Sequence, residues 1–279
     1  MSDFPTSARV VIIGGGAVGA SALYHLCKAG WTDCVLLEKN ELTAGSTWHA
    51  AGNVPTFSSR WSIMNMQRYS AELYRRLGDE VDYPMNYNVT GSVRLGHTKE
   101  RLQEFQKVVG MGRYQGMDLK ILSPEDIKKV YPFVETHDLT GALHDPYDGD
   151  IDPAQLTQAL AKGARQMGAR IERFCPATGV RREGDEWVVE TEKGEIHCEI
   201  VVNAAGYYAR EVGKWFGRDV PMIAAAPPLP DTWPPAHSDR RRPCPTLARK
   251  SSTIPMHWTA RSIAPTSRTR MPKSRIWAT

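Results

Sequence analysis

A glycine-rich turn directly after a buried strand constrains the fold of this chain more than any other feature. Residues 10–13 are a short β-branched run, which is typical of a buried parallel strand. The residues that follow place Gly14, Gly16 and Gly19 in a G-x-G-x-x-G pattern. Gly14 allows a tight turn, Gly16 lets the backbone approach a pyrophosphate, and Gly19 lets the next helix pack closely on the strand. The pattern predicts a site for dinucleotide phosphates.

The residues after the turn complete a βαβ unit. We expect a helix over residues 17–29, with Val18, Leu23 and Leu26 facing the sheet. Cys34–Leu37 has the pattern of a second buried strand. Strand, helix and strand in this order predict a right-handed crossover, with the phosphates at the positive N-terminus of the helix.

An acidic residue stands where such sites hold a ribose. Glu38 directly follows the second strand and lies 19 residues after Gly19. Its carboxylate can accept hydrogen bonds from both hydroxyls of an adenosine ribose, and it would repel the 2′-phosphate of NADP. A solvated loop carboxylate is the alternative interpretation. The agreement of strand, glycines, helix and acid favours a dinucleotide site over a chance glycine pattern.

A loop of small residues favours FAD over NAD. Residues 41–52 read Glu-Leu-Thr-Ala-Gly-Ser-Thr-Trp-His-Ala-Ala-Gly. An NAD enzyme has no evident use for such a loop here. In a flavin enzyme the chain must pass along the pyrophosphate toward the isoalloxazine ring, and small residues permit that close approach.

The same loop resembles a known family. The string at residues 43–52 is similar to that of the dimethylglycine and sarcosine dehydrogenases, within the flavoproteins related to D-amino-acid oxidase (the DAO group). In that family the histidine at the position of His49 is joined covalently to the flavin 8α-methyl carbon. The resemblance therefore implies FAD bound covalently through His49. A histidine that touches the cofactor without a bond, or a packing histidine, is the alternative.

Later segments extend the resemblance over roughly residues 9–223. Residues 149–153 resemble the family segment that returns the chain from the substrate domain, and residues 201–206 resemble its last FAD-domain strand and turn. Ala177 lies where the family sets a small residue against the adenine. No catalytic side chain and no metal ligand is identified. The resemblance implies that the cofactor-binding residues are Gly14, Gly16, Ala17, Val18, Gly19, Glu38, Lys39, Gly45, Ser46, Thr47, Ala50, Ala51, Gly52, Ala177 and Gly206.

The expected fold is α/β. A Rossmann-like FAD-binding domain is expected over residues 9–85 and 150–223, with an inserted α+β substrate domain over residues 86–149 that is incomplete toward the C-terminus. Ser123 and Asp152, each followed by proline, predict helix N-caps, and the second heads a helix over residues 153–167. A hairpin is expected around residues 192–194. An amphipathic helix is predicted over residues 59–77 by its apolar residues Ile63, Met66, Tyr69, Leu73 and Leu77.

Composition changes sharply near residue 224. Residues 225–279 contain ten Lys or Arg, two Asp or Glu, 10 of the 19 prolines and none of the 23 glycines. Such a segment buries too little apolar area to offset its ordering entropy, so residues 224–279 are predicted to be a disordered, non-homologous tail. The excess of Arg, Pro, Ser and Thr in this tail is typical of out-of-frame translation of a GC-rich gene. We therefore expect a chain that is truncated or frameshifted near residue 224. A natural basic arm that binds acidic partners is the alternative.

The resemblance implies oxidation of the C–N bond of an N-methyl amino acid, sarcosine or dimethylglycine, by hydride transfer to the flavin. The expected partners are this substrate and an electron acceptor, either a carrier flavoprotein or oxygen, with neither nucleic acid nor a membrane. A non-catalytic, flavoprotein-like regulatory module or an inactive truncated fragment is the alternative.

Cysteines and the N-terminus bear on the compartment. The five cysteines lack CxxC or metal spacing and are expected to be reduced. No apolar run approaches the roughly 20 residues that cross a bilayer. The first nine residues leave no room for a targeting peptide, so the cytoplasm is the expected location.

Overall fold

The computed structural model describes residues 4–224 and the backbone of residues 253–255. These residues form two compact units. Within the described residues, the first unit comprises residues 4–50, 76–86 and 152–224, and the second comprises residues 51–75 and 87–151 with the strand at 253–255. The fold is mixed α/β, as the sequence predicts.

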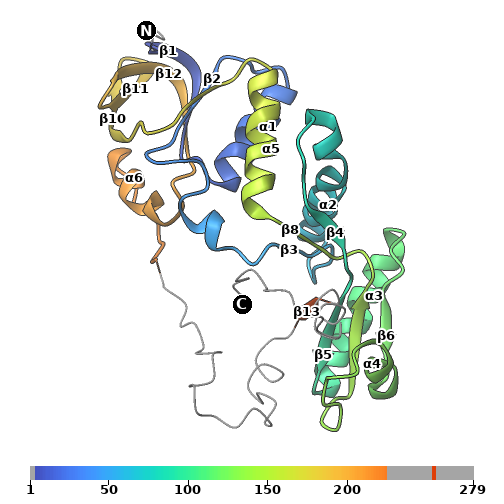
Figure 1. Cartoon of the computed structure of the whole chain (residues 1–279). Helices are drawn as coiled ribbons and strands as arrows, with labels where there is room; N and C mark the ends of the chain where they lie inside the picture. The colour runs from blue at the N-terminus through green and yellow to red at the C-terminus, as the bar shows by residue number, and fades with distance from the viewer. Residues whose placement is uncertain (1–3, 225–252, 256–279) are drawn as a thin grey trace, which may run out of the picture. The chain divides into compact units, whose positions relative to one another are not determined.

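The first unit is built on a six-stranded sheet (Figure 1). Its central strands are parallel, since β1 pairs with β12 on one side and β2 on the other, and β2 pairs with β9. β10, β11 and β12 form an antiparallel meander at one edge. In spatial order the strands are β10 (Ala177–Glu183), β11 (Glu186–Thr191), β12 (Gly194–Asn203), β1 (Ser7–Ile13), β2 (Cys34–Leu37) and β9 (Arg170–Glu172).

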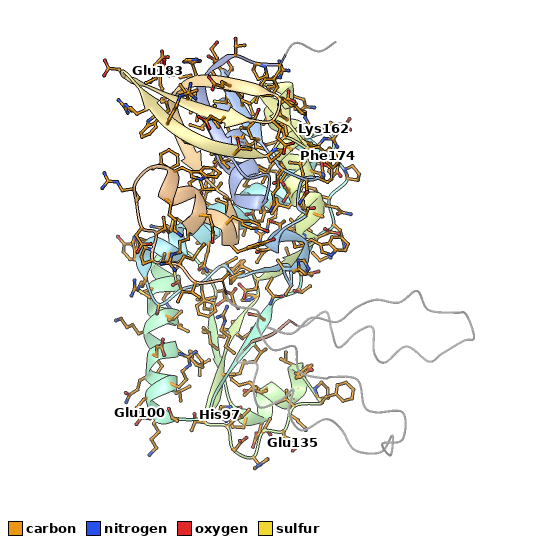
Figure 2. The ribbon with its side chains drawn as sticks, turned by 90° about the vertical axis from the view of Figure 1, so that its left-hand side faces the viewer. His97, Glu100, Glu135, Lys162, Phe174 and Glu183 are labelled. Atoms are coloured by element: carbon orange, nitrogen blue, oxygen red, sulfur yellow. The ribbon has the colours of Figure 1, made fainter. Side chains whose placement is uncertain are left out.

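Two helices of this unit pack against one another beside the sheet. α1 (Ala17–Lys28) and α5 (Pro153–Gln166) lie side by side (Figure 1). Gly163 makes this contact possible, because a Cβ there would lie 2.8 Å from the ring of Tyr24 on α1. Lys162, labelled in Figure 2, donates to the backbone oxygen of Asp82. The remaining helical elements are η1 (Ser46–His49), η2 (Gly206–Tyr208) and α6 (Ala209–Trp215).

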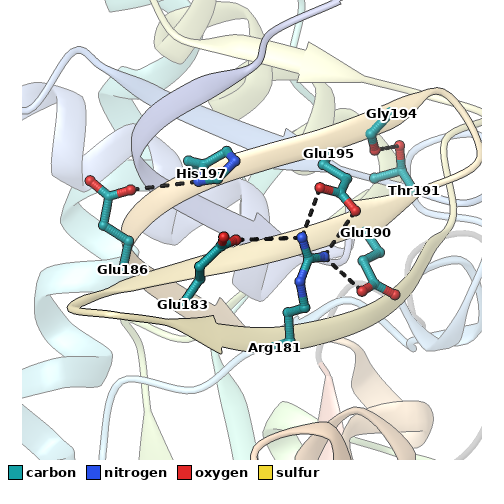
Figure 3. Close-up of polar contacts among 8 residues, drawn as sticks. All are labelled: Arg181, Glu183, Glu186, Glu190, Thr191, Gly194, Glu195 and His197. Carbon is teal, nitrogen blue, oxygen red and sulfur yellow. Dashed lines mark hydrogen bonds and ion pairs between the residues drawn. The ribbon is translucent and has the colours of Figure 1, made fainter.

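Ion pairs cross the outer face of the meander (Figure 3). The guanidinium of Arg181 lies 2.8 Å from a carboxylate oxygen of Glu190 and 2.9 Å from one of Glu195. β11 and β12 are joined by residues 192–193, and Gly194 has a φ of 141°. This confirms the predicted hairpin, whose turn needs a residue without a side chain.

The second unit holds two antiparallel sheets. One has the order β13 (Thr253–Pro255), β5 (Ser92–Gly96), β7 (Gly141–Asp145) and β6 (Lys120–Leu122). The other has the order β3 (Asn53–Val54), β8 (Gly149–Ile151) and β4 (Tyr87–Val89). α3 (Lys99–Tyr114) and α4 (Pro124–Val130) pack on the first of these sheets. Figure 2 labels His97 and Glu100 at the start of α3, with Glu135 in the loop that follows α4.

Helix α2 (Trp61–Val81) contributes residues to both units, and its buried face differs from the predicted one. Leu73 and Leu77 are buried as predicted, but Met66 and Tyr69 are 58% and 45% exposed. Met64 is buried instead, in the cluster around Phe105 and Leu143. The predicted stripe is wrong at residues 66 and 69 because the buried face is rotated away from them: Met64, Ala71 and Val81 lie on one buried stripe that runs along the helix.

One boundary differs from the sequence-based expectation. Residues 51–75 cluster with the second unit, whereas we expected them in the FAD-binding domain. The prediction of a disordered tail concerns residues that lie outside the described ones, except at Thr253–Pro255. There the backbone pairs antiparallel with β5, Ile254 opposite Val93.

None of the helices in the described part of the chain is both long enough and apolar enough to cross a bilayer.

Candidate functional site

The carboxyl ends of three parallel strands meet in the first unit. The Gly14 N–H, directly after β1, donates to the Leu37 oxygen at the end of β2 over 2.8 Å. The Ala204 N–H, directly after β12, donates to the Ile13 oxygen over 2.9 Å. Ligands of open α/β sheets bind outside the carboxyl ends of the strands, so this edge is the place to look for a site.

Two of the three glycines of the motif are required by close backbone contacts. Gly14 has a φ of 119°, and a Cβ there would lie 2.3 Å from the Ala204 oxygen. A Cβ at Gly19 would lie 1.9 Å from the Gly14 oxygen, so helix and strand could not keep their present separation. At Gly16 the nearest atom to a Cβ is the Thr47 hydroxyl oxygen, at 3.0 Å. The tight turn and the close packing predicted at Gly14 and Gly19 are therefore confirmed.

Helix α1 begins directly after this turn. Gly16 is its N-cap and provides no side-chain hydrogen bond. Val18, which we predicted to face the sheet, is 74% exposed and lines the cavity at the strand ends. Leu23, which we also predicted to face the sheet, is buried. A positive helix end with exposed small residues is suited to an anionic ligand.

Glu38 holds the turn to the end of β2. One of its carboxylate oxygens accepts from the Gly15 N–H over 2.7 Å, and the other accepts from the Asn40 N–H over 2.9 Å. A carboxylate has about four lone-pair positions, so two remain for further donors. Glu38 is thus a fixed acceptor beside the glycine turn, as the ribose-binding prediction requires.

The small-residue loop closes another side of the turn. The Thr43 N–H donates to the Gly15 oxygen over 3.1 Å, and the Thr47 hydroxyl accepts from the Ala17 N–H over 3.0 Å. Thr43 has a φ of 74°, which bends the chain back toward α1. The loop from residues 43–47 therefore lies against the helix N-terminus.

These elements enclose a cavity of about 370 Å³. The predicted residues that line it are Gly14, Gly16, Ala17, Val18, Glu38, Lys39, Gly45, Ser46, Thr47 and Gly206. Gly19 acts in packing instead. His49, Ala50, Ala51 and Gly52 are not among its lining residues, and the last two belong to the second unit.

A second, more apolar cavity of about 250 Å³ shares Gly14, Glu38 and Lys39 with the first. Ala177, predicted to lie against an adenine, lines this cavity together with Pro176. The volume is adequate for a heteroaromatic ring, and an apolar cleft bounded by a few polar groups is the usual form of a small-molecule site.

Two tyrosines beside these cavities were missed by sequence reasoning. Tyr207 and Tyr208 follow Gly206, and their ring centroids are 4.3 Å apart. The Lys39 ammonium lies 3.4 Å from the Tyr208 ring centroid. A hydrogen bond with Lys39, and a second with Tyr207, lower the pKa of the Tyr208 phenol. The only sequence signal was an aromatic pair after a glycine at a strand end.

His49 is exposed at the end of η1. Its Nδ1 lies 3.1 Å from the Gly45 oxygen. A carbonyl can only accept, so this contact selects the tautomer in which Nδ1 carries the proton and Nε2 carries the lone pair.

Together these features define a dinucleotide-binding α/β protein of the Rossmann type. They are the strand ends, the glycine turn, the helix N-terminus and the Glu38 carboxylate. Comparison with known proteins narrows the class. The chain belongs to the DAO family of FAD dependent oxidoreductases, whose sequence profile it matches over residues 9–248. The match runs past residue 224, where we expected the family resemblance to end.

Two of the curated relatives carry the family names that the sequence resemblance implies. The chain is 43% identical over 222 residues to a mitochondrial dimethylglycine dehydrogenase of Rattus norvegicus, covering 79% of this chain and 26% of the relative. It is 35% identical over 227 residues to a mitochondrial sarcosine dehydrogenase of Homo sapiens, covering 79% and 25%. It is 38% identical over 210 residues to a mitochondrial pyruvate dehydrogenase phosphatase regulatory subunit of Mus musculus, covering 75% and 24%. The chain thus spans about a quarter of the length of these relatives.

Solved structures share the fold. The L-proline dehydrogenase of P. horikoshii is 27% identical and superposes with a TM-score of 0.71, covering 77% of this chain and 57% of that one.

Proposed function

We propose that this chain binds FAD in the two cavities at the strand ends, with the adenine beside Ala177, the ribose on Glu38 and the pyrophosphate at the N-terminus of α1. The observation that carries the proposal is the convergence of Gly16, Glu38 and Thr47 on one cavity of about 370 Å³. Membership of an FAD-dependent family supports the choice of dinucleotide.

The residues present fit the cofactor. A hydrogen atom at Gly16 leaves the cavity floor clear where a side chain would meet Thr47. Glu38 keeps lone pairs for ribose hydroxyls. The apolar cavity is lined by Leu37, Pro176 and Trp215, which suits a flat ring.

We further propose that His49 joins the flavin covalently. The contact of Nδ1 with the Gly45 oxygen leaves Nε2 as the nitrogen with a free lone pair, and His49 is exposed on the loop that follows the phosphate site. A covalent bond would keep the flavin on the chain and raise its oxidising power.

Acid precipitation tests the attachment. We expect purified chain to be yellow and the flavin to stay with the acid pellet. In His49→Ala the flavin should appear in the supernatant, and in the exposed control His137→Ala it should not. Flavin released equally by the unchanged chain and by His49→Ala would overturn the covalent proposal while leaving FAD binding intact.

For the reaction we propose oxidation of the C–N bond of an N-methyl amino acid such as sarcosine or dimethylglycine. Bound FAD would supply the hydride acceptor, and this chain would hold and orient its dinucleotide part. The supporting observation is similarity to relatives with those dehydrogenase names. Turnover of either amine with an artificial electron acceptor tests the proposal, and absence of turnover by flavin-loaded chain would contradict it for this chain.

A non-catalytic module is the second candidate. The observation that favours it is the 38% identity to a relative named as a phosphatase regulatory subunit. It predicts bound flavin without amine turnover, so the same assay separates the two functions. The electron acceptor, a carrier flavoprotein or oxygen, and the cytoplasmic location stay predictions.

A further inference from the structure

The second unit contains a buried pair of carboxyl groups that the proposed function does not use. Asp145 ends β7 and is 0% exposed, and Asp148 lies three residues later and is 4% exposed. Ionised carboxylates are almost never fully buried unless each has a charged or hydrogen-bonding partner. The partners of this pair therefore decide its charge.

Asp148 is well supplied with donors. One of its carboxylate oxygens accepts from the Thr56 N–H over 2.6 Å, and the other accepts from the Ser92 hydroxyl over 2.5 Å. An Arg94 nitrogen lies 3.7 Å from the second oxygen. Asp148 therefore has the surroundings of a carboxylate.

Asp145 has fewer donors. Its carboxyl accepts from the Tyr147 N–H over 2.9 Å and from the Thr56 hydroxyl, also over 2.9 Å. The same hydroxyl lies 3.1 Å from Asp148, and its single proton can serve only one of the two acids at a time. With one guanidinium for two carboxyls, full ionisation would bury an uncompensated negative charge. Burial, and after it the charge of Asp148, raise the pKa of Asp145.

Other charged and titratable groups surround the pair, and among the described residues no second cation forms an ion pair with it. Burial lowers the pKa of Arg94, whose guanidinium lies 3.7 Å from the Phe57 ring centroid. The remaining groups that interact with the pair or with these neighbours are Tyr87 on β4, Arg75 on α2, His144 on β7, Asp150 on β8, Arg101 on α3, and Asp118 and Lys120 near β6.

We propose that Asp145 and Asp148 hold one proton between them. This shared proton keeps residues 53–57 bound to β5 and β7. Thr56 is the point of attachment, since its N–H and its hydroxyl both bind the pair. The backbone oxygen of Asp148 also accepts hydrogen bonds from the Thr90 and Gly91 N–H groups. These bonds hold the residues just before β5 next to the pair. Loss of the proton places two like charges around one hydroxyl and weakens the hold on Thr56.

Amide hydrogen exchange at Thr56 in the full chain tests whether the shared proton holds this residue in place. Protection of the Thr56 N–H, corrected for intrinsic exchange, should fall about tenfold per pH unit from roughly pH 5 to 7 and then level off. Asp145→Asn, which is neutral at every pH, should make this protection independent of pH over the same range. Asp118→Asn is the matched control, because Asp118 is exposed and pairs with Lys120, and it should keep the dependence.

A second measurement covers the case in which Asp145→Asn fails to fold. Carboxyl ¹³C NMR of the unchanged chain should show one aspartate titrating near neutral pH. Every aspartate titrating below about pH 5, or a Thr56 pH dependence that survives in folded Asp145→Asn, would overturn the proposal. Neither readout depends on bound flavin, so failure here is distinguishable from failure of the proposed function.

Discussion

Among single residues, Gly16 and Gly19 belong to one motif but serve different purposes, and substitution separates them. Gly19→Ala forces a methyl group to within 1.9 Å of the Gly14 oxygen, so α1 must move. We expect the free energy of unfolding to fall by about 1–3 kcal/mol. Gly16→Ala meets only the Thr47 hydroxyl at 3.0 Å and should change stability much less, while weakening FAD binding.

Urea unfolding and FAD titration of both variants check this pair. Gly110→Ala is the control, because nothing lies near a Cβ there and alanine is favoured inside α3 by about 0.5–1 kcal/mol. Equal loss of stability in Gly16→Ala and Gly19→Ala would contradict the separate roles.

The buried thiols should be inert in the native chain. Burial raises the pKa of Cys34 and of Cys198 to about 11 in each case, above the ordinary value near 8.5. Because the folded pKa exceeds the unfolded one, stability from these groups is present below about pH 8.5 and is lost as the pH rises toward 11. We expect iodoacetamide at pH 8 to alkylate these two cysteines only after unfolding, as peptide mass spectrometry would show. Rapid alkylation of the native chain would count against this account.

At the scale of secondary-structure elements, the N-cap of α5 depends on one side chain, that of Asp152. Asp152 accepts from the Ala154 and Gln155 N–H groups over 2.8 and 3.1 Å. Asp152→Ala should lower the free energy of unfolding by about 1 kcal/mol, whereas Asp152→Asn should restore most of the loss. Chemical denaturation measures both, and an unchanged midpoint in Asp152→Ala would show that the cap contributes nothing.

Elements with strong local signals could be predicted from the sequence. β2 begins and ends at the predicted residues, and Ser123 and Asp152 cap α4 and α5 as expected. The buried face of α2 could be predicted only in part, because it depends on which neighbours cover Met64 and leave Met66 exposed. Periodicity reports a helix, but tertiary packing decides its orientation.

The residues of the candidate site also differ in whether they could be predicted from the sequence. Gly14, Gly19 and Glu38 act through the backbone geometry of a strand and a turn, and this geometry follows from a short stretch of sequence. Tyr208 reaches Lys39 from a segment about 170 residues away, so only the paired strands β1, β2 and β12 bring the two together. The Asp145–Asp148 pair was missed because its hydrogen-bond donors Thr56 and Ser92 lie in other segments.

For the whole molecule, stability should depend on pH through Asp145. Its folded pKa is raised to about 7, above the unfolded value near 4. The folded chain therefore binds more protons between these values, and its stability falls as the pH rises from about 4 to 7. The difference in unfolding free energy between the unchanged chain and Asp145→Asn isolates this effect. This difference in unfolding free energy should change by a few kcal/mol between about pH 4 and pH 7, as the raised pKa of Asp145 implies. Above about pH 7 it should stay constant.

In the function proposed above, the chain recognises the adenosine half of a flavin dinucleotide. The most direct test is a fluorescence titration of flavin-free chain with FAD and with FMN, using His49→Ala so that the flavin exchanges freely. We predict binding of FAD at least about tenfold tighter than that of FMN, which lacks the adenosine, and loss of most of this preference in Glu38→Ala. Equal affinity for the two flavins, or a preference for FAD that Glu38→Ala leaves unchanged, would contradict the account.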